Sequence, residues 1–408
     1  MAETKNTKAF YNTEIPSSWR VRKLGDFIER IVGGGTPSRD NPKYWNGKIK
    51  WATVKDFSNF NPYGTQETIT EEGLKNSASN LIPKETLITA TRMALGKVVK
   101  FNIDVAINQD LKAIFPKPEL DSGYLFYWFD KNTTLIEGLG NGSTVKGITL
   151  DDLKGIPFYQ IPLPEQRAIA RVLSIWDEAI QKTEKLIAQK ELRKKWLMQN
   201  LLTGKMRLKG FEGTKWKIQP LENFIKPIVR EVPKPSTPYL GIGLRSHGKG
   251  TFLKHDEQPE KNSMDNFYVV RPNDLIVNIT FAWEQAIAIV RPEDDGALAS
   301  HRFPTYTFIE DKGHPDFFRF YILQPRMKFM LQMISPGGAG RNRVMSKSDF
   351  IKLEFLLPEY KEQTAIAQVL QAADKEISLL KAKAGKFREQ KKGLMQVLLT
   401  EKKRLKID

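Results

Sequence analysis

Basic and amide side chains recur next to one another in this sequence, a combination suited to reading nucleic acid. Arg and Lys can pair with guanine edges and hold phosphates, whereas Asn and Gln can pair with adenine. The candidate DNA-binding residues of the first half are Arg39, Lys43, Lys48, Lys50, Arg92, Lys97, Asn108, Gln109 and Lys146. Those of the second half are Arg245, His247, Lys249, Lys254, Asn278, His301, Arg302, Arg341, Asn342 and Arg343. The run Gly337–Arg343 is the strongest single candidate, because flexible glycines beside two guanidinium groups suit insertion into a groove.

No set of residues has the spacing of a catalytic or metal site. The sequence lacks the Gly-x-x-x-x-Gly-Lys-Ser/Thr phosphate loop, and Gly33–Pro37 has the wrong spacing for a nucleotide fingerprint. Asn61-Pro62-Tyr63 lacks the second proline of the amino-methyltransferase tetrapeptide and is interpreted as a turn. The stretch Pro292–Asp295 is interpreted as a solvated loop. The four histidines, His247, His255, His301 and His314, show no ligand spacing, so no metal site is predicted.

Composition favours a folded protein with a polyanionic partner. The chain carries 64 Lys and Arg against 47 Asp and Glu, a formal charge of +17 over 408 residues. With 40% hydrophobic residues it can build cores, and its length predicts two domains rather than one. It has no cysteine, which excludes disulfides and cysteine-ligated metal sites. Without a signal peptide or a long apolar stretch at sequence level, we expect a cytoplasmic protein with no membrane partner.

An internal repeat organises the chain. When the sequence is shifted by 197 residues, 21 of 45 positions are identical between residues 165–209 and 362–406, without a gap. The same shift superposes Trp19 and Leu24 on Trp216 and Leu221, while the intervening stretches diverge. Each copy therefore consists of a variable module followed by a constant one.

The constant modules have the pattern of long helices. Apolar residues recur at heptad spacing over about 40 residues, which corresponds to roughly 60 Å of helix. The predicted seam residues are Leu173, Trp176, Ile180, Ile187, Leu197 and Leu201 in the first copy and Leu370, Ile377, Leu380, Phe387, Leu394 and Leu398 in the second. Lys194 and Lys391 occupy the same heptad position, and Lys190 also faces the seam of the first helix. Matched length and register predict an antiparallel coiled coil between the two copies.

The variable modules have mixed, strand-rich patterns. Short strands are predicted at Thr86–Thr91, Asp274–Thr280 and Ala286–Val290, and Thr149 and Ser346 are predicted to cap short helices. The predicted fold class is α+β, with two similar mixed α/β domains separated by two long antiparallel helices in a pseudo-twofold repeat. The predicted domains are residues 1–155, spacer helix 156–209, residues 210–352 and spacer helix 353–408.

These features resemble the DNA-specificity subunits of type I restriction-modification systems. The resemblance covers nearly the whole chain and is based on the repeat, on Gly34–Ser38 followed by Tyr44–Trp51, on Tyr239–Gly250, and on helices that begin near Glu-Gln and end in Leu-Leu-Thr. It implies two target-recognition domains, each of which reads one half of a bipartite double-stranded DNA sequence. The helices would set the unread spacer and dock the methyltransferase subunits.

The resemblance also implies which chemistry lies elsewhere. Two modification subunits would supply S-adenosylmethionine and adenine methylation, and restriction subunits would supply translocation and cleavage driven by ATP with Mg. This chain is then expected to bind no cofactor and to be a non-catalytic part of a host-defence complex. Two alternatives stay open at this stage. One is a nuclease or methyltransferase that acts alone with tandem domains, and the other is a two-module RNA-binding or architectural protein.

Overall fold

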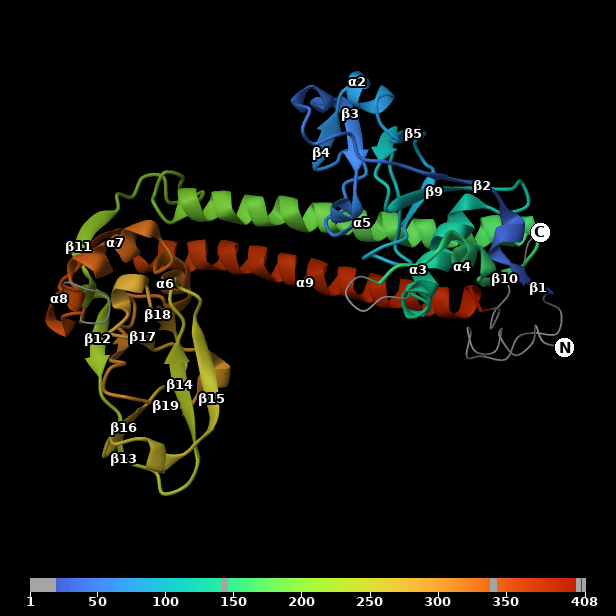
Figure 1. The fold of residues 1–408 in the computed structure, drawn as a ribbon. Coiled ribbons are helices and arrows are strands. Elements are labelled where there is room, and N and C mark those ends of the chain that lie inside the picture. The colour runs from blue at the N-terminus through green and yellow to red at the C-terminus, as the bar shows by residue number, and fades with distance from the viewer. Residues whose placement is uncertain (1–19, 141–145, 338–342, 401–404, 406–408) are drawn as a thin grey trace. The chain divides into compact units, whose positions relative to one another are not determined.

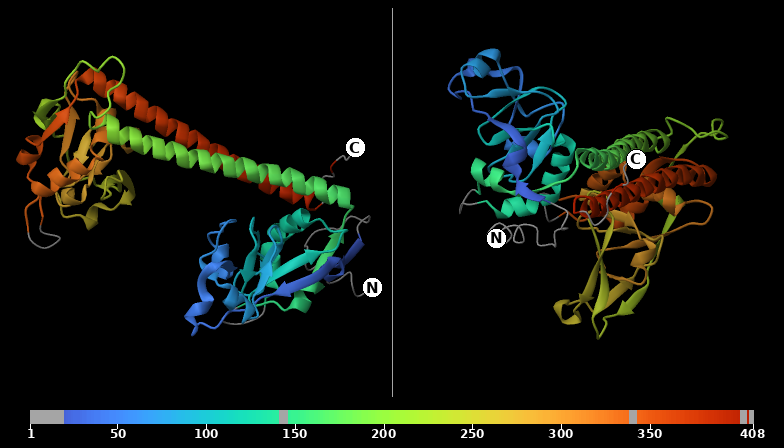
Figure 2. Two further views of the ribbon diagram at one scale, coloured as in Figure 1. Left: turned by 90° about the horizontal axis from the view of Figure 1, so that it is seen from above. Right: turned by 90° about the vertical axis from the view of Figure 1, so that its right-hand side faces the viewer.

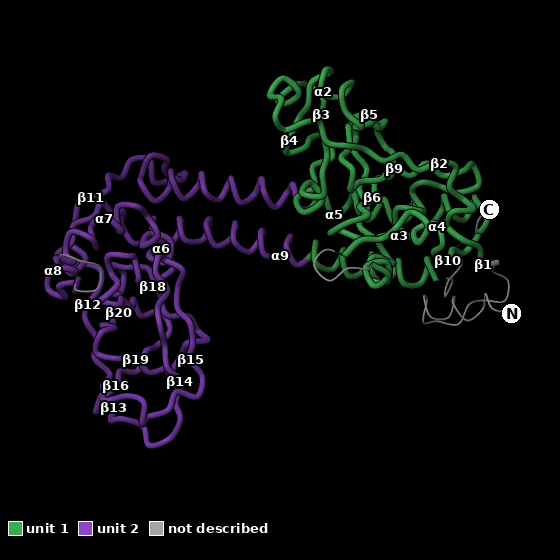
Figure 3. The backbone as a smooth tube through the Cα atoms, viewed as in Figure 1, with its two compact units in different colours: residues 1–183, 383–408 green, residues 184–382 purple. Residues whose placement is uncertain are grey.

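The computed structural model describes residues 20–140, 146–337, 343–400 and 405 of the 408-residue chain. It divides into two compact units (Figure 3): residues 1–183 with 383–408 form unit 1, and residues 184–382 form unit 2. Each unit contains one mixed module, which we call module 1 (residues 20–160) and module 2 (residues 217–357). Each unit also contains one half of each long helix, α5 (Leu163–Leu201) and α9 (Tyr360–Leu398).

Module 1 is built from three sheets. A two-stranded antiparallel sheet pairs β1 (Arg20–Lys23) with β10 (Pro157–Gln160). The second sheet has the order β2 (Ile28–Gly33), β9 (Leu111–Pro116), β6 (Leu87–Ala90), β7 (Val98–Lys100). The third has the order β4 (Glu67–Ile69), β3 (Trp45–Ala52), β8 (Val105–Ile107), β5 (Asn80–Ile82). The helices are α2 (Glu71–Lys75), α3 (Ser122–Gly138) and α4 (Leu150–Gly155), with short 3-10 helices η1 (Leu24–Phe27), η2 (Pro42–Tyr44) and η3 (Val54–Phe57).

Module 2 repeats this topology. Strands β11 (Lys217–Pro220) and β21 (Glu354–Leu357) form the two-stranded sheet, and the second sheet has the order β12 (Ile225–Ile228), β20 (Thr305–Phe308), β17 (Leu275–Val277), β18 (Ile287–Ile289). The third has the order β13 (Glu231–Pro233), β16 (Asn266–Val269), β19 (Leu298–Ala299), β14 (Tyr239–Leu244), β15 (Thr251–Glu257). The helices are α6 (Pro315–Tyr321), α7 (Pro325–Met333), α8 (Lys347–Ile351), η4 (Leu221–Asn223), η5 (Pro259–Lys261), η6 (Ala282–Glu284) and η7 (Pro292–Asp294).

The equivalence of the two modules extends to strand direction. The third sheet contains one parallel pair in each module, β3 with β8 and β14 with β19, among antiparallel neighbours. Module 2 adds only β13 at the edge. The predicted α+β fold class with an internal repeat is therefore confirmed.

The two long helices pair in an antiparallel manner within each unit, and they lie side by side in the views of Figures 1 and 2. In unit 1, the rings of Trp176 and Phe387 are 5.6 Å apart. In unit 2, Lys194 contacts Asp374 and Glu191 contacts Lys381. The residue numbers therefore rise along α5 in the direction in which they fall along α9. Each helix has 39 residues and thus a length of about 58 Å at 1.5 Å per residue.

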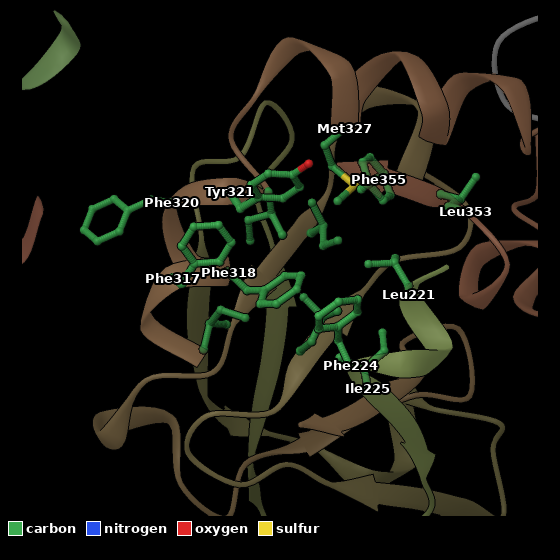
Figure 4. Close-up of a cluster of buried hydrophobic side chains, with 14 of the residues drawn as sticks. Leu221, Phe224, Ile225, Phe317, Phe318, Phe320, Tyr321, Met327, Leu353 and Phe355 are labelled. Carbon is green, nitrogen blue, oxygen red and sulfur yellow. The ribbon is translucent and has the colours of Figure 1, made fainter. Parts of the chain in front are cut away.

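Each module core includes the start of one long helix and the end of the other. In unit 1, the core takes in Ile169 and Leu173 of α5 together with Leu398 of α9 and the following Leu399. In unit 2, it takes in the residues 197 positions away, which are Ile366, Leu370, Leu201 and Leu202. Figure 4 shows the aromatic part of the second core, where Phe318 of α6 lies against Phe224. The repeat in sequence is thus a repeat in packing.

The predicted seam residues are all at least partly buried. Five are fully buried, namely Leu173, Leu201, Leu370, Ile377 and Leu398, and the other seven are intermediate, namely Trp176, Ile180, Ile187, Leu197, Leu380, Phe387 and Leu394. Four of the five buried residues, all except Ile377, belong to the module cores. The helix ends therefore serve two purposes, because the same face that pairs the helices also seats the modules.

Most local predictions are confirmed and one is wrong. Strands β6, β17 and β18 lie within the predicted ranges, and the side chains of Thr149 and Ser346 accept hydrogen bonds at the starts of α4 and α8. The stretch Pro292–Asp295 is not simply a solvated loop. Asp294 has no solvent exposure, and it accepts hydrogen bonds from Arg291 and Thr251, which connect η7 to the first residue of β15.

Candidate nucleic-acid interface

Three segments of module 1 converge at one edge. The amide of Thr91 donates to the Asp110 carbonyl at 2.8 Å, and the amide of Ile148 donates to the Thr91 carbonyl at 3.0 Å. The amide of Met93 donates to the carbonyl of Lys146 at 3.3 Å. These bonds bring together segments 91–93, 108–110 and 146–148, which we call loop cluster 1. It contains four of the predicted DNA-binding residues, Arg92, Asn108, Gln109 and Lys146.

Module 2 has the same arrangement, which we call loop cluster 2 (segments 278–281, 300–302 and 343–345). The amide of Ile279 donates to the Arg302 carbonyl at 3.0 Å, and the amide of Met345 donates to the Ile279 carbonyl at 2.8 Å. Four predicted residues fall here, Asn278, His301, Arg302 and Arg343. The guanidinium of Arg343 lies 5.3 Å from the ring centre of Trp283. Arg341 and Asn342 lie outside the described residues.

The two clusters share a backbone frame but differ in side chains. The hydrogen-bond pattern matches Thr91 with Ile279, Asp110 with Arg302, and Ile148 with Met345. In the same frame, Lys146 corresponds to Arg343, and both are basic. By contrast, loop cluster 1 has the acidic Asp110 where loop cluster 2 has the basic Arg302. Such a change alters which base edges or phosphates the edge could contact, without altering the scaffold.

The two asparagines predicted to read adenine organise their own loops. Asn108 is buried, its Oδ1 accepts from the amide of Asp110, and its amide group donates to the Asp110 carboxylate. Asn278 is also buried, and its Oδ1 accepts from the amide of Thr280 at 3.0 Å. In the unbound chain both side chains therefore hold the turn that presents their neighbours.

A glycine-rich turn packs beside loop cluster 1. A Cβ on Gly34 would lie 1.9 Å from the carbonyl oxygen of Ile107, so the backbones approach too closely for any other residue. The hydroxyl of Thr36 donates to Oε1 of Gln109 at 2.6 Å. Sequence reasoning missed Thr36 as a neighbour of Gln109. The Gly-Thr-Pro run was the available signal.

Lys112 adds a cation to loop cluster 1 that sequence reasoning also missed. Its ammonium donates to the carbonyl of Gln109 and to that of Leu111. Burial lowers the pKa of Lys112, Asp110 raises it, and the charge of Arg92 lowers it further. The pKa of Lys112 is therefore lowered mainly because its ammonium is partly buried, and the charge of Arg92 contributes less.

The other basic candidates of module 1 lie before or on η2, on β3 of the third sheet, or just before β7. The guanidinium of Arg39 pairs with both carboxylate oxygens of Glu67 and lies 3.7 Å over the ring of Trp45. The hydrogen bond from Arg39 is the main reason why the pKa of Glu67 lies below its ordinary value. Lys43 is exposed on η2. On β3, Lys48 is exposed and Lys50 is half-buried. Lys97 is exposed just before β7. None of these five belongs to the three segments of loop cluster 1.

The remaining candidates of module 2 lie on the β14–β15 hairpin. Arg245 donates to the carbonyl of Thr251 at 2.7 Å and lies 4.9 Å from the ring centre of Phe252. His247 has a φ of 63°, and its amide donates to the carbonyl of Glu284 at 2.7 Å. Lys249, Lys254 and His255 are exposed along the same hairpin. The hairpin turn is thus fastened to η6, next to loop cluster 2.

A cleft of about 450 Å³ opens between this hairpin and loop cluster 2. Its lining runs along β14 at Gly241 and Gly243, and the ring of Phe252 lies where a side chain on Gly243 would be. Sequence reasoning missed most of the lining, which includes Ser246, Phe281, Glu284, Ser300 and Phe303.

Within residues 20–140, 146–337 and 343–400, no three His, Asp or Glu side chains gather in a way that could hold a metal ion. No helix in that part of the chain is both long and apolar enough to cross a membrane.

Comparison with known proteins places these features in one family. The family model of the type I restriction modification DNA specificity domain matches residues 16–191 and again residues 231–386. The chain belongs to this family. The two matches correspond to the two modules with their following helix segments, in agreement with the internal repeat.

Curated relatives support the same assignment. The chain is 31% identical over 233 residues to the MjaIX specificity subunit of Methanocaldococcus jannaschii, covering 54% of this chain and 50% of that one. It is 30% identical over 188 residues to the EcoR124I/EcoR124II specificity subunit of Escherichia coli, covering 43% and 45%. These alignments span about half the length of each relative. A third, with the putative MjaX subunit of M. jannaschii at 26% identity, covers 96% and 95%.

Solved structures share the fold. The S subunit of a type I system from M. genitalium superposes with a TM-score of 0.55 at 14% identity, over 97% of this chain and 99% of that chain. The HsdS subunit from Thermoanaerobacter tengcongensis gives 0.51 at 15% identity, over 95% and 98%. The curated relatives are named as specificity subunits of type I restriction enzymes.

Proposed function

We propose that the chain is the DNA-specificity subunit of a type I restriction-modification complex, in which module 1 and module 2 each read one half of a bipartite target. The observation that carries the proposal is the pair of loop clusters, one backbone frame with different side chains in each module. Loops that vary on a constant scaffold are a common way for one fold to recognise different targets. A pseudo-twofold pair of readers suits double-stranded DNA, because DNA offers matching local dyads along its grooves.

The long helices are proposed to set the unread spacer and to dock two methyltransferase subunits. Docking is supported by apolar side chains that the helices leave exposed. In unit 2, Leu192 and Trp196 of α5 are 68% and 51% exposed, and they share one face because they are four residues apart. Exposed Trp and Leu side chains on one helix face are typical of a protein interface.

Cofactor chemistry is proposed to lie on the partners. S-adenosylmethionine would be used by the methyltransferase subunits, and ATP with Mg by restriction subunits, while the present chain contributes DNA contacts. A complex of this kind acts on chromosomal DNA, which places it in the cytoplasm. This location agrees with a chain that has no cysteine.

The proposal is tested by mapping methylated adenines in cells that carry the chain with its methyltransferase partner. Replacing Arg92 and Lys146 by alanine should relax or abolish selection at one half-site only. Replacing Arg302 and Arg343 should affect only the other. Lys154→Ala and Lys352→Ala, which remove exposed lysines outside both clusters, serve as controls. Equal loss at both half-sites from either pair would contradict the modular assignment.

A second test separates this function from the two alternatives. The purified chain is incubated with duplex DNA, RNA, magnesium, ATP and S-adenosylmethionine. We expect DNA binding that strengthens in selectivity when the methyltransferase is added, and no cleavage or methyl transfer by the chain alone. Catalysis by the pure chain would favour an autonomous enzyme, and a preference for RNA would favour an RNA-binding protein.

A further inference from the structure

The two lysines at matched heptad positions form equivalent ion pairs across the helix pair. In unit 2, Nζ of Lys194 lies 2.5 Å from Oδ1 of Asp374. In unit 1, Nζ of Lys391 lies 2.7 Å from Oδ1 of Asp177. Lys391 is 197 residues after Lys194, and Asp374 is 197 residues after Asp177. The two pairs are therefore images of each other under the internal repeat.

Each lysine also contacts an aromatic ring of the adjacent module. Lys194 lies 5.5 Å from the ring centre of Phe320 of α6, and Lys391 lies 5.1 Å from that of Tyr127 of α3. Figure 4 shows Phe320 turned away from Phe317 and Phe318, the main body of its cluster. The Tyr127 hydroxyl donates to Oδ2 of Asp177 at 2.8 Å. We call each set of lysine, aspartate and aromatic residue a node. Each node joins three elements, namely α5, α9 and a helix of the module, which is α6 in unit 2 and α3 in unit 1.

The lysines are enclosed while the aspartates are not. The side chains of Lys194 and Lys391 are 24% and 15% exposed, against 48% and 41% for Asp374 and Asp177. A lysine held this far from water needs an acceptor or a carboxylate, whereas a half-exposed aspartate can be solvated without one. A register that separates the pair would therefore cost free energy mainly because the lysine, and not the aspartate, loses its partner.

The apolar seam repeats every seven residues, so a slip of one heptad would still bring apolar residues together; for example, Trp176 would exchange Phe387 for Leu380 or Leu394. A slip of one heptad in one direction would place Lys194 opposite Ala367 and Lys391 opposite Ala170, so neither lysine would keep its aspartate and Lys391 would keep only Asp130 of α3, 3.9 Å away. A slip in the other direction would place Lys391 opposite Glu184 but Lys194 opposite Lys381, which repels it. Only one antiparallel register satisfies both nodes.

We propose that the nodes Lys194–Asp374–Phe320 and Lys391–Asp177–Tyr127 specify the register of α5 against α9 and thereby act as positioning residues for the two recognition modules. The consequence for DNA spacing rests on the proposed function, but the claim about register does not. A competing determinant is the burial of both helix ends in each module core. The two explanations make different predictions for a chain in which the lysines are replaced by apolar residues.

The test measures register directly in the full chain, which has no native cysteine to remove. Spin labels at Gln189→Cys and Lys361→Cys, both exposed and both in unit 2, report the axial offset of the helices by pulsed EPR. A slip of one heptad changes this offset by about 10.5 Å. The unaltered chain should give one distance, and the variant Lys194→Leu with Lys391→Leu should add a second population.

The thermal stability of the same variants shows whether the two lysines specify the register or only stabilise the fold. The leucine variant removes the lysine of each pair and leaves an aspartate that is about half exposed and can be solvated, so its Tm should change little while it loses the single distance. Lys194→Arg with Lys391→Arg should retain one distance. Lys195→Leu with Lys392→Leu, which alters the neighbouring exposed lysines, is the matched control and should change nothing.

Charge reversal provides a second arm that does not depend on leucine packing. Lys194→Asp with Lys391→Asp should shift the distance or broaden it, and adding Asp374→Lys with Asp177→Lys should restore one distance. A single unchanged distance in both the leucine and the reversed variants would overturn the proposal and assign register to the module cores. Failure of the proposed DNA function would leave these distances unaffected.

Discussion

Gln166 and Gln363 make the same three hydrogen bonds at the starts of the two long helices. Nε2 of Gln166 donates to the carbonyls of Glu119 and Ile161, and its Oε1 accepts from the amide of Asp121. Nε2 of Gln363 donates to the carbonyls of Lys312 and Pro358, and its Oε1 accepts from the amide of His314. Both side chains are buried, so each glutamine ties a helix start to two separate segments of its module.

Replacing either glutamine by alanine should destabilise the corresponding unit. Three backbone groups would lose their partner, and the buried carbonyl among them, that of Ile161 or Pro358, would cost about 1–3 kcal/mol if left unsatisfied. Denaturant unfolding followed by circular dichroism measures the loss. Gln181→Ala and Gln368→Ala, exposed on the same helices, should cost less than about 0.5 kcal/mol. A buried-site variant as stable as its exposed control would show that water replaces the side chain.

The contact between Arg207 and Glu362 connects the segment that follows α5 to the start of α9. Nε and an Nη of Arg207 donate to the Glu362 carboxylate at 2.6 Å, and the indole N–H of Trp216 donates to it at 3.0 Å. Glu362 is 2% exposed and Arg207 17%. Glu362→Ala should therefore cost about 3–5 kcal/mol, because it removes the carboxylate partner of a largely buried guanidinium and leaves it only its hydrogen bonds to Thr214. A loss below 1 kcal/mol in denaturant unfolding would show that Arg207 finds another acceptor.

The sequence predicted the fold more fully than the site. The heptads and the 21 shared positions identified the helices because periodicity and repetition are properties of the chain itself. The partners of Lys194 and Lys391 were not predicted, since Asp374 and Asp177 lie outside the apolar positions of the heptad. Asn108 and Asn278 were predicted to read bases, yet their buried side chains hold turns. Whether a polar loop residue faces inward depends on backbone contacts between distant segments, which no local pattern encodes.

Acid should weaken module 2 through Asp294. Burial alone would raise the pKa of this carboxyl, but hydrogen bonds from Arg291 and Thr251 outweigh it and hold the pKa below the ordinary value of 3.8. A lowered pKa in the folded state means that the stabilisation is present above pH 3.8 and is lost as the pH falls through the folded-state value. The unfolding free energy of the unaltered chain should therefore fall more steeply below pH 4 than that of Asp294→Asn, which has no proton to gain. Parallel curves for the two proteins between pH 5 and pH 3 would contradict this assignment.

Removing Leu192 and Trp196 should weaken methyltransferase docking without unfolding the chain. The two side chains are exposed, so alanine at both positions leaves no cavity in the core. A buried Trp or Leu anchor in an interface commonly contributes about 2 kcal/mol, which corresponds to roughly 30-fold in affinity. Titration calorimetry with the methyltransferase subunit measures the change, and Lys195→Ala is the control. Unchanged affinity would place the docking surface elsewhere on the helices.

Salt dependence should reveal how many cations of the loop clusters contact phosphates. DNA binding by a chain of charge +17 releases counterions, so log K should fall steeply with log salt. Arg302→Ala with Arg343→Ala should reduce the slope by about one for each residue that holds a phosphate. A residue that reads a base edge instead should lower selectivity with little change in slope. Fluorescence anisotropy at several salt concentrations decides between these roles, and a flat line for the unaltered chain would mean that its charge lies away from DNA.

The helix pair should act as a ruler whose length can be changed in register. One heptad inserted after Ala188 and one after Gly385 lie between the two nodes, because Ala188 falls between Asp177 and Lys194, and Gly385 between Asp374 and Lys391. Both nodes therefore stay paired while each helix grows by about 10.5 Å. At about 3.4 Å per base pair this corresponds to roughly three more unread pairs.

Such a variant should keep both half-site sequences and lengthen the spacer between them. The modules would also need to rotate by about a hundred degrees around the duplex, so DNA twisting or bending at a cost of a few kcal/mol should reduce activity. A heptad inserted after Ala188 alone is the matched control, since it separates the nodes by unequal lengths and should abolish selective methylation. Mapping methylated adenines reads out both variants. An active double-insertion chain that retained the original spacer would show that something other than α5 and α9 determines the distance between half-sites.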